Sequence, residues 1–434
     1  MEELTHLDQT HVWHPFTQEA TAPPPIPIVS ASGAWLQGAD GRRYMDLISS
    51  WWLSVHGHTH PYIAQAIANQ ARLLEHVIFA GLTHEPAIRL AQRLTQLLSG
   101  ELTRVFYSDN GSTAVEVALK MAIQYHRNQS DHRHRVVVLE GGYHGDTVGA
   151  MSLGRSSGFF NAFDDYLFQV DTLPFPATWE GDDTVEEREE EALATLTRYL
   201  DRHGSEMAAI ILEPLVQGAG GMRMCRPQFL QTMVANVRQT GSLVVFDEVM
   251  TGFGRTGSLF ACEKIGVFPD LLCLSKGLTG GFLPMAVTIC RQSVYEAFLG
   301  KTFDRALAHG HSFTANPLGC AAALASLDLF ATGHPLRHCA TLEVVHRERL
   351  REISNHPRVS KPRCCGVIAA LNVTGSTQGY TAVIGEKLKT FFLAHGFLIR
   401  PLGDCIYLLP PYCLTTEELH TAWDVIHLAL DQVT

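Results

Sequence analysis

Five apolar runs of strand length do most to limit the folds that this chain can adopt. The runs are continuous rather than alternating, so both faces of each strand would have to be buried. Strands of this kind belong to a mostly parallel sheet that helices cover on both sides. The sequence therefore predicts an α/β fold with a mostly parallel central sheet. The runs are Val136–Leu139, Ala208–Leu212, Leu243–Phe246, Leu271–Leu274 and Met285–Ile289.

Helix-forming segments lie between and around these runs. Glu85–Leu98 carries apolar residues at helical spacing, the short strand Arg104–Tyr107 follows, and Ser112–Arg127 is expected to be helical. The Ala- and Leu-rich segment Pro317–Phe330 predicts another helix. The acidic stretch Glu180–Glu191 is interpreted as a solvated loop that enters a surface helix, without a function of its own.

The chain is expected to divide into three parts. Residues 1–60 begin irregularly, because Pro23, Pro24, Pro25 and Pro27 forbid a helix there, and continue with short strand-like pieces such as Ala34–Leu36 and Tyr44–Leu47. This segment is expected to form an N-terminal arm that is part of the small domain. Residues 61–330 form the large domain, in which strands and helices alternate. Residues 331–434 form a smaller C-terminal α/β domain, and the start of its last helix, Thr415–Val433, resembles a capping box.

Charge and composition exclude several classes of protein. A net charge of -11 argues against a general polyanion binder, so small molecules are the expected ligands and no nucleic-acid partner is expected. No apolar run is long enough to cross a membrane, and the first residues lack the features of a secretion signal, so we expect a cytoplasmic protein. The ten cysteines are scattered, which is typical of reduced, mostly buried thiols.

One acid and one amine follow two of the apolar runs. Asp247 comes directly after Leu243–Phe246, and Lys276 comes two residues after Leu271–Leu274. Open α/β sheets keep their ligand crevice at the carboxyl ends of the strands. The pair suits pyridoxal 5'-phosphate (PLP), because a lysine amine forms a Schiff base with the cofactor and an aspartate keeps its ring nitrogen protonated. Alone, such a lysine would more often be a surface residue.

The wider context of this pair resembles the class III aminotransferases of PLP fold-type I. The segments Phe246–Gly257 and Lys276–Gly281 are highly specific for that family, and the resemblance covers roughly residues 11–412. It implies a PLP-dependent transaminase with the fold-type I architecture. It also implies a homodimer whose active sites lie at the subunit interface.

Within the family, six further segments are similar to the members that act in biotin biosynthesis. This resemblance implies S-adenosylmethionine as amino donor and 8-amino-7-oxononanoate as acceptor. Lysine as donor, an ornithine- or 4-aminobutyrate-type aminotransferase and a non-catalytic homologue stay open as alternatives. The segments are Trp13–Thr17, Ser49–Trp52, Val216–Met224, Phe260–Glu263, Ile399–Pro401 and Ile406–Pro411.

A helix N-terminus is available for the cofactor phosphate. The stretch Ser108–Thr113 opens a helix directly after a strand, so free amides and the helix dipole would attract an anion. By resemblance, Gly111 and Ser112 hold the phosphate. The simpler interpretation is that Ser112 or Thr113 caps the helix together with Glu116, and the two roles are compatible.

The resemblance also implies the remaining site residues. Tyr143 would lie against the cofactor ring and near the substrate, and with Lys276 and Asp247 it completes the expected catalytic set. A partner-subunit segment would add a second phosphate contact through His311 and Ser312, where the family usually has Pro-Thr, and Gly310 would lie near the substrate. The expected substrate contacts are Phe16, Trp51, Trp52, Tyr143, Lys276, Gly310, Arg400 and Tyr407.

Two of these residues carry a specific expectation. The planar guanidinium of Arg400 can donate two parallel hydrogen bonds to a substrate carboxylate. Phe16 stands where close relatives carry tyrosine, so the aromatic face is kept and a hydroxyl contact is lost.

Two other motifs suggest different chemistry. Gly154–Gly158 fits the G-x-S-x-G nucleophile elbow of serine hydrolases, but its flanks do not predict the required strand and long helix. His56, His58 and His60 alternate in a loop without a matching cluster of acids or cysteines, so no metal is expected.

Overall fold

The large sheet has seven strands, and six of them run in the same direction. A computed structural model describes residues 2–98, 100–375 and 382–433. The single reversed strand, β12, pairs antiparallel with both of its neighbours, β4 and β11. The prediction of an α/β fold with a mostly parallel sheet is confirmed. In spatial order the strands are β4 (Arg104–Ser108), β12 (Ala286–Cys290), β11 (Leu271–Leu274), β10 (Leu243–Asp247), β7 (Met207–Leu212), β5 (Arg135–Leu139) and β6 (Asp171–Leu173).

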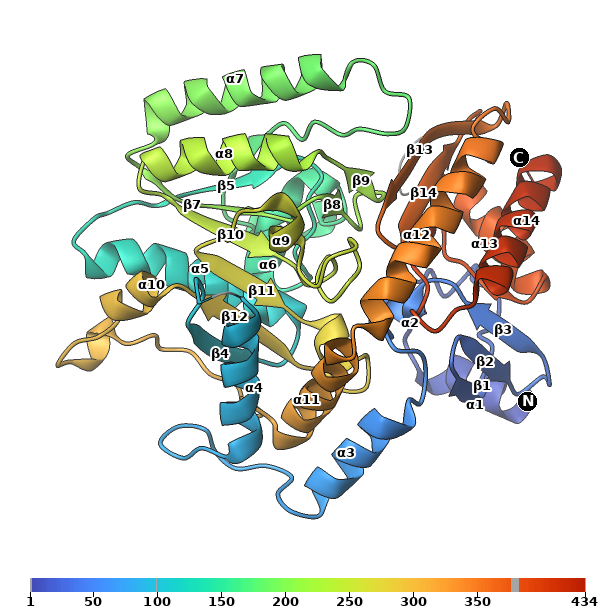
Figure 1. Cartoon of the computed structure of the whole chain (residues 1–434), viewed down its shortest axis with the longest axis horizontal. Coiled ribbons are helices and arrows are strands. Elements are labelled where there is room, and N and C mark those ends of the chain that lie inside the picture. The colour runs from blue at the N-terminus through green and yellow to red at the C-terminus, as the bar shows by residue number, and fades with distance from the viewer. Residues whose placement is uncertain (1, 99, 376–381, 434) are drawn as a thin grey trace.

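Both faces of this sheet are buried, which explains why its strands are continuously apolar. Val244 and Phe246 of β10 belong to the main core, with Leu230 of α8, while Val245 belongs to a second core with Ala118 of α5. In Figure 1, α7 and α8 lie on one side of the sheet and α5 on the other. The helices of this part of the chain are α3 (Pro61–Ala71), α4 (Glu85–Leu97), α5 (Gly111–Asn128), α6 (Val148–Leu153), α7 (Val185–His203), α8 (Pro227–Gln239), α9 (Ala261–Ile265), α10 (Gln292–Ala297) and α11 (Pro317–Ala331).

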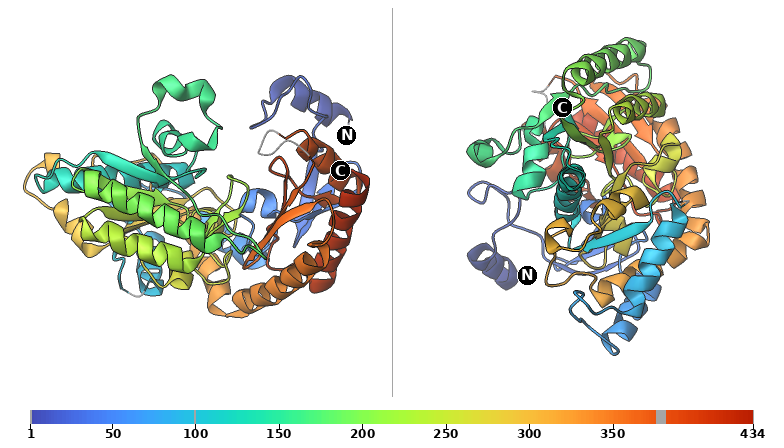
Figure 2. Two further views of the ribbon diagram at one scale, coloured as in Figure 1. Left: turned by 90° about the horizontal axis from the view of Figure 1, so that it is seen from above. Right: turned by 90° about the vertical axis from the view of Figure 1, so that its left-hand side faces the viewer.

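The two ends of the chain pack together beside this large sheet. Strand β15 (Phe397–Leu398) pairs in parallel with β3 (Arg43–Asp46), so a C-terminal strand completes a sheet begun by the N-terminal segment. Both chain ends lie on the same side of the molecule (Figures 1 and 2). The remaining elements here are β1 (Ile28–Ser32), β2 (Trp35–Gly38), a second sheet of β13 (Val359–Cys365), β14 (Ile368–Val373) and β16 (Cys405–Leu408), and the helices α12 (His334–Ile353), α13 (Ile384–Ala394) and α14 (Thr416–Gln432).

In the first sixty residues the predicted strand-like pieces are confirmed, since they overlap β2 and β3, but the irregular remainder also contains β1 and two helical segments. Glu2–His11 forms helix α1, and Ser49–Trp52 forms the short helical turn α2. Helix α1 buries none of its residues, so the apolar periodicity that reveals most helices is missing. Its acidic first turn and its last residue, His11, complement the helix dipole instead.

The caps of two helices were also predicted. The Thr415 hydroxyl accepts a hydrogen bond from the Glu418 amide, and Glu418 accepts one in return, which confirms the capping box of α14. At α5 the predicted cap is wrong, because Asn110 occupies the N-cap and pairs with Thr113. Glu116, the predicted capping partner, instead accepts hydrogen bonds from Thr147 and Gly149.

All ten cysteines lie in the described residues and are free. Eight are buried, Cys364 is half-buried and Cys413 is exposed, so the expectation of mostly buried thiols is confirmed. None of the helices in the described ranges combines the length and the apolar character that crossing a bilayer requires.

Candidate active site

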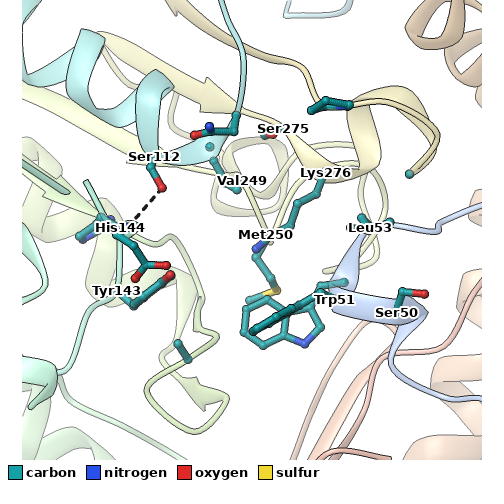
Figure 3. Close-up of a pocket in the computed structure, with 18 of the residues that line it drawn as sticks. Ser50, Trp51, Leu53, Ser112, Tyr143, His144, Val249, Met250, Ser275 and Lys276 are labelled. Atoms are coloured by element: carbon teal, nitrogen blue, oxygen red, sulfur yellow. Dashed lines mark hydrogen bonds between the residues drawn. The ribbon is translucent and has the colours of Figure 1, made fainter. Parts of the chain in front are cut away.

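A cavity of about 610 Å³ opens at the carboxyl ends of the parallel strands. Four strand ends contribute to it: Tyr143 and His144 follow β5, Glu213 follows β7, Asp247 ends β10, and Lys276 follows β11. Residues from both ends of the chain close the opposite side. Figure 3 shows Lys276 between the side formed by Ser112 and Tyr143 and the side formed by Ser50 and Trp51. This is the position at which open α/β sheets bind ligands.

Lys276 reaches into this cavity from a strained backbone. Its φ of 46° lies in the left-handed region, which non-glycine residues rarely adopt. Its Nζ lies 4.5 Å from the centre of the Trp52 ring. Burial lowers the pKa of the Lys276 amine to about 8, against the opposing effect of the carboxylates of Asp247 and Glu213. A large fraction of the amine is therefore uncharged at mildly alkaline pH and can act as a nucleophile or base.

Asp247 is held by a buried histidine. Its Oδ2 lies 2.8 Å from Nδ1 of His144, and both side chains are buried. Burial disfavours the imidazolium, but the hydrogen bond and the charge of Asp247 outweigh it and raise the pKa of His144. The second oxygen, Oδ1, accepts a hydrogen bond from the Val249 amide. Asp247 is thus fixed in orientation by these two hydrogen bonds.

Glu213 is a second buried carboxyl at the cavity. It accepts hydrogen bonds from the amides of Tyr143 and Gly218, at 3.0 Å and 2.9 Å. Burial raises the pKa of Glu213 to about 7, and the nearby charge of Asp247 acts in the same direction. These two hydrogen bonds fix the loop that carries Tyr143, whose ring stacks on Phe160 at 6.1 Å.

The start of α5 borders a concave surface, the phosphate cup, where Gly111 and Gly145 have no side chain. A Cβ on Gly111 would lie 2.6 Å from Val249, and a Cβ on Gly145 would lie 2.1 Å from the Ser112 hydroxyl oxygen. Among the described residues, nothing accepts a hydrogen bond from the Gly111 and Ser112 amides. First-turn amides of this kind bind phosphate. The arrangement therefore fits the phosphate of PLP, with Asp247 and Lys276 at the same cavity for its ring and its aldehyde.

The turn Ser49–Trp52 brings two aromatic residues to the cavity at the expense of backbone strain. Ser49, Ser50 and Trp52 all have positive φ angles, between 49° and 69°. Asp46 stabilises the turn, because its carboxylate accepts hydrogen bonds from the Ile48 and Ser50 amides. Several strained residues at one cavity are typical of a functional site, where surrounding contacts keep an unfavourable conformation.

Two groups of aromatic contacts hold the side chains on the side of the cavity that the two chain ends form. Trp52 donates from Nε1 to the Tyr407 hydroxyl at 3.0 Å. The Arg400 guanidinium lies over the Trp51 ring at 4.6 Å, and Phe16 meets the same ring edge-on at 5.8 Å. Arg400 makes no ion pair with any described residue, so its charge is available to a ligand.

The structure gathers most of the predicted site residues and leaves three outside. Gly310 and Ser312 are exposed, and His311 contacts His309 at 3.3 Å instead of the cavity. No described contact brings this segment to the cavity of its own chain. The predicted residues that line the cavity are Phe16, Trp51, Trp52, Gly111, Ser112, Tyr143, Asp247, Lys276, Arg400 and Tyr407.

Sequence reasoning missed several residues of the cavity. Glu213 directly follows the apolar run of β7, so the rule that led to Asp247 could also have led to it. His144 stands next to Tyr143, but its contact with Asp247 joins residues 103 apart in sequence, and no local pattern predicts it. Phe159 and Met250 also line the cavity and gave no signal beyond ordinary apolar residues.

The two competing motifs have structural roles. Gly154–Gly158 follows helix α6 rather than a strand, and the Ser156 hydroxyl accepts a hydrogen bond from the Gly141 amide. The strand-to-helix turn of a nucleophile elbow is therefore missing from this segment. His56 contacts Ser326, and His58 contacts Asp46.

Comparison with known proteins agrees with this geometry. The sequence model of the family described as aminotransferase class-III matches residues 16–430. The chain is 52% identical to adenosylmethionine-8-amino-7-oxononanoate aminotransferase of Synechococcus elongatus, over 98% of this chain and 99% of the relative. It is 39% identical to the protein of the same name from Geobacter sulfurreducens, over 99% and 98% of the two chains.

Solved structures show the same fold. The crystal structure of adenosylmethionine-8-amino-7-oxononanoate aminotransferase from Methanocaldococcus jannaschii matches with a TM-score of 0.93 and 32% identity, over 100% of this chain and 99% of that one. A PLP-bound amine transaminase from an uncultivated Pseudomonas species matches with a TM-score of 0.91 and 29% identity, over 98% and 99%. With the family match over nearly its whole length and a cavity that fits the cofactor, this chain belongs to the class-III aminotransferases and is a PLP-dependent transaminase.

Proposed function

We propose that this enzyme transfers the amino group of S-adenosylmethionine to 8-amino-7-oxononanoate, which gives 7,8-diaminononanoate for biotin biosynthesis. The observation that carries this proposal is the identity of 52% to a relative named for these two substrates, over almost the full length of both chains. The M. jannaschii structure bears the same name. The cavity, which combines an apolar aromatic wall with one arginine, suits an oxo-acid with a long alkyl chain.

The described residues suggest how the cofactor is held. The Gly111 and Ser112 amides would bind its phosphate, Asp247 its ring nitrogen, Tyr143 the face of its ring, and Lys276 its aldehyde carbon. When bound, PLP supplies a carbonyl that takes up the amino group and a ring that withdraws electrons from the reacting carbon. Asp247 would keep that ring nitrogen protonated, since His144 and the Val249 amide fix the orientation of its carboxylate.

Lys276 would move the proton in each half of the reaction. Its Nζ would take up the proton that leaves the α-carbon of the donor, hold it, and return it later in the same half of the reaction. A positioned base typically accelerates such a step by about 10²–10⁴-fold. The lowered pKa, about 8, allows the amine to accept and release a proton near neutral pH.

Arg400 would bind the carboxylate of the oxo-acid. Its guanidinium is oriented by the Trp51 ring and makes no ion pair with a described residue, so it can form two parallel bonds with a carboxylate. Trp51, Trp52, Tyr407 and Phe16 would contact the alkyl chain of the acceptor and parts of the donor in turn. Rigid aromatic walls serve two different substrates because they bind through shape and apolar area.

We further propose that the active enzyme is a homodimer in the cytoplasm, whose segment Gly310–Ser312 completes the partner's site. Gly310 and Ser312 are exposed and do not line their own cavity. The N-terminal segment also exposes large apolar side chains, including Trp13 at 89%. Ten free cysteines are compatible with a reducing compartment.

Within each subunit we propose three units, residues 1–60, 61–330 and 331–434. The first unit packs with the third through the pairing of β3 and β15.

Subunit mixing tests the shared site. Lys276→Ala and Ser312→Asp proteins would each be inactive, but in a hybrid dimer one of the two sites has both native residues. Denaturing, mixing and refolding the two variants should restore about one quarter of the wild-type activity. Activity no higher than that of the separate variants, or an active monomer in size-exclusion measurements, would contradict the proposal.

Single-turnover measurements test the substrates. The loaded enzyme is mixed with S-adenosylmethionine, lysine, ornithine or 4-aminobutyrate, and the absorbance band of the cofactor is followed. We expect S-adenosylmethionine to change the band and the subsequent addition of 8-amino-7-oxononanoate to restore it with formation of 7,8-diaminononanoate. A response to ornithine or 4-aminobutyrate alone would overturn the assigned substrates and leave the transaminase chemistry intact.

A further inference from the structure

The turn that carries Lys276 has left-handed backbone angles at three positions. It runs from Lys276 to Thr279 and is followed by Gly280 and Gly281. The φ angles of Lys276, Gly280 and Gly281 are 46°, 63° and 88°. A residue other than glycine keeps such a conformation only when its surroundings hold it there. The contacts that hold this turn therefore also decide where the Lys276 amine lies in the cavity (Figure 3).

Two hydroxyls stabilise the turn from within the loop between β11 and β12. Ser275 donates a hydrogen bond to the Met285 carbonyl at 2.8 Å, and Thr279 donates one to the Leu283 carbonyl at 2.7 Å. Both bonds join residues that are close in sequence. They shape the loop, but they do not tie it to a neighbouring helix.

A third hydroxyl reaches the turn from helix α11. Ser326 is completely buried, and its Oγ lies 3.3 Å from the Gly277 carbonyl oxygen. A carbonyl oxygen can only accept, so the Ser326 hydroxyl must be the donor. The same oxygen accepts a hydrogen bond from the Gly280 amide at 3.0 Å, and its two lone pairs allow both bonds to form together. Ser326 thus connects the peptide next to Lys276 to a separate helix.

His56 completes this contact. Its Nε2 lies 3.0 Å from Oγ of Ser326. Because the single hydroxyl hydrogen is directed to Gly277, the Ser326 oxygen must accept from His56, and Nε2 must carry the imidazole hydrogen. Burial lowers the pKa of His56 to about 3, so the ring stays neutral near physiological pH. The ring also packs against Phe330 of α11, with 4.7 Å between the ring centres.

The segment that supplies His56 also contacts Lys276 directly. Trp52 comes four residues before His56, and the Lys276 Nζ lies 4.5 Å from the centre of its ring. Val55 approaches the turn closely, because a Cβ on Gly277 would lie 3.1 Å from its Cγ1. One N-terminal segment therefore contacts the amine of Lys276 through Trp52 and the backbone beside it through His56 and Ser326.

We propose that Ser326 and His56 are positioning residues for Lys276, because their hydrogen-bond chain holds the Gly277 carbonyl and with it the backbone that directs the amine into the cavity. The inference rests on the proposed role of Lys276 and adds two residues that are not among those lining the cavity in the described part of the chain. It also gives the first of the alternating histidines a role that needs no metal. The chain serves both halves of the reaction equally, because Lys276 acts in both.

Hydrogen–deuterium exchange tests the contact without the cofactor. Two backbone amides of the turn donate to carbonyls within it, so their exchange reports whether the turn is held. We expect Ser326→Ala to raise the exchange rate of the peptide covering residues 276–281 at least threefold in the cofactor-free, full-length protein. Ser242→Ala is the matched control and should leave that peptide unchanged. Ser242 is also buried and also donates to a carbonyl, that of Met207, but it lies at the other end of β10 from Asp247.

Kinetics of the PLP-loaded enzyme separate positioning from substrate binding. Loss of one neutral hydrogen bond should lower kcat about 3- to 10-fold in Ser326→Ala. The KM values for S-adenosylmethionine and 8-amino-7-oxononanoate should stay within about twofold, because Ser326 acts on the turn and not on the substrates. His56→Gln keeps an N–H donor near the position of Nε2 and should retain at least about half of the wild-type kcat. His56→Phe keeps only the ring and should lose kcat as Ser326→Ala does.

The double variant decides whether the two residues act as one chain. Adding His56→Phe to Ser326→Ala should cause no further loss of kcat, since the histidine acts only through the serine. The inference is overturned if the two losses multiply, if Ser326→Ala equals Ser242→Ala in both kcat and exchange, or if it raises either KM while kcat is unchanged. Failure of the proposed function looks different: borohydride reduction of the loaded wild-type enzyme would then leave the cofactor on a lysine other than Lys276.

Discussion

Nδ1 of His144 lies 2.8 Å from Oδ2 of Asp247, and both side chains are buried. A buried carboxylate is stable only when it is hydrogen-bonded, and the histidine supplies a donor to Oδ2. His144 therefore acts as a positioning residue that keeps the Asp247 carboxylate oriented, although it does not itself have to touch the substrate.

Replacing His144 should weaken the action of Asp247. A hydrogen bond to a charged group contributes about 1.5–3 kcal/mol, so His144→Phe should lower kcat by about 10- to 150-fold. His144→Asn keeps a donor and should recover part of that loss. The cofactor absorbance measured against pH separates positioning from general damage, because only a changed ring nitrogen shifts its titration. An unshifted titration in His144→Phe would contradict the role.

The lowered pKa of Lys276 predicts selective labelling of the cofactor-free protein. An amine reacts with acetic anhydride only when it is uncharged, so the labelling rate of Lys276 should rise with pH and reach half its maximum near pH 8, following its pKa of about 8. An exposed lysine such as Lys301 is the internal control for the reagent. Peptide mass spectrometry gives both rates from one sample, and a Lys276 rate that still rises well above pH 8 would refute the shift.

Arg400 and Trp51 should contribute unequally to binding of the oxo-acid. Arg400→Met removes a charged pair of hydrogen bonds and should raise the KM for 8-amino-7-oxononanoate about 10- to 150-fold. Trp51→Leu only releases the guanidinium from its ring and should raise that KM about 2- to 5-fold. Arg400→Lys keeps the charge without the fork and should fall between the two. Steady-state kinetics at saturating donor tests this order, which an unchanged KM in Arg400→Met would exclude.

Phe16→Tyr should have little effect. The ring is 48% exposed and meets Trp51 edge-on, so an added hydroxyl can remain in water and the aromatic contact is kept. Exposed substitutions of this kind usually change stability by no more than about 0.5 kcal/mol. We expect kcat/KM for both substrates to stay within threefold of the wild-type values. A larger gain would show that the hydroxyl has a contact that this chain has lost.

The sequence predicted the elements that carry the site better than the contacts between them. Apolar runs locate β5, β7, β10 and β11 because burial on both faces leaves an uninterrupted pattern, and Asp247 and Lys276 follow from their places after such runs. Helix α1 could not be found in this way because it buries no residue.

Long-range contacts explain most of what was missed. The bond from His144 to Asp247 and that from Trp52 to Tyr407 join residues 103 and 355 apart, so each exists only once the sheet and both chain ends have assembled. The cap of α5 was misassigned for a local reason, since Asn110, Ser112 and Thr113 can all cap a helix and only the backbone geometry selects Asn110.

The close approach of Gly145 to Ser112 gives the last prediction. Gly145 has a φ of +123°, and a Cβ there would lie 2.1 Å from the Ser112 hydroxyl oxygen and 2.8 Å from its Cα. The hydroxyl could turn away but the Cα could not, so Gly145→Ala should push the start of α5 aside and disturb the phosphate cup. Gly181→Ala is the matched control, because Gly181 also has a positive φ, +79°, but nothing lies within 4 Å of the added Cβ. Both variants should lose about 1–2 kcal/mol to backbone strain, whereas only Gly145→Ala should bind PLP at least tenfold more weakly when dialysed protein is titrated with the cofactor. Equal PLP affinity in the two variants would show that the start of α5 does not hold the phosphate.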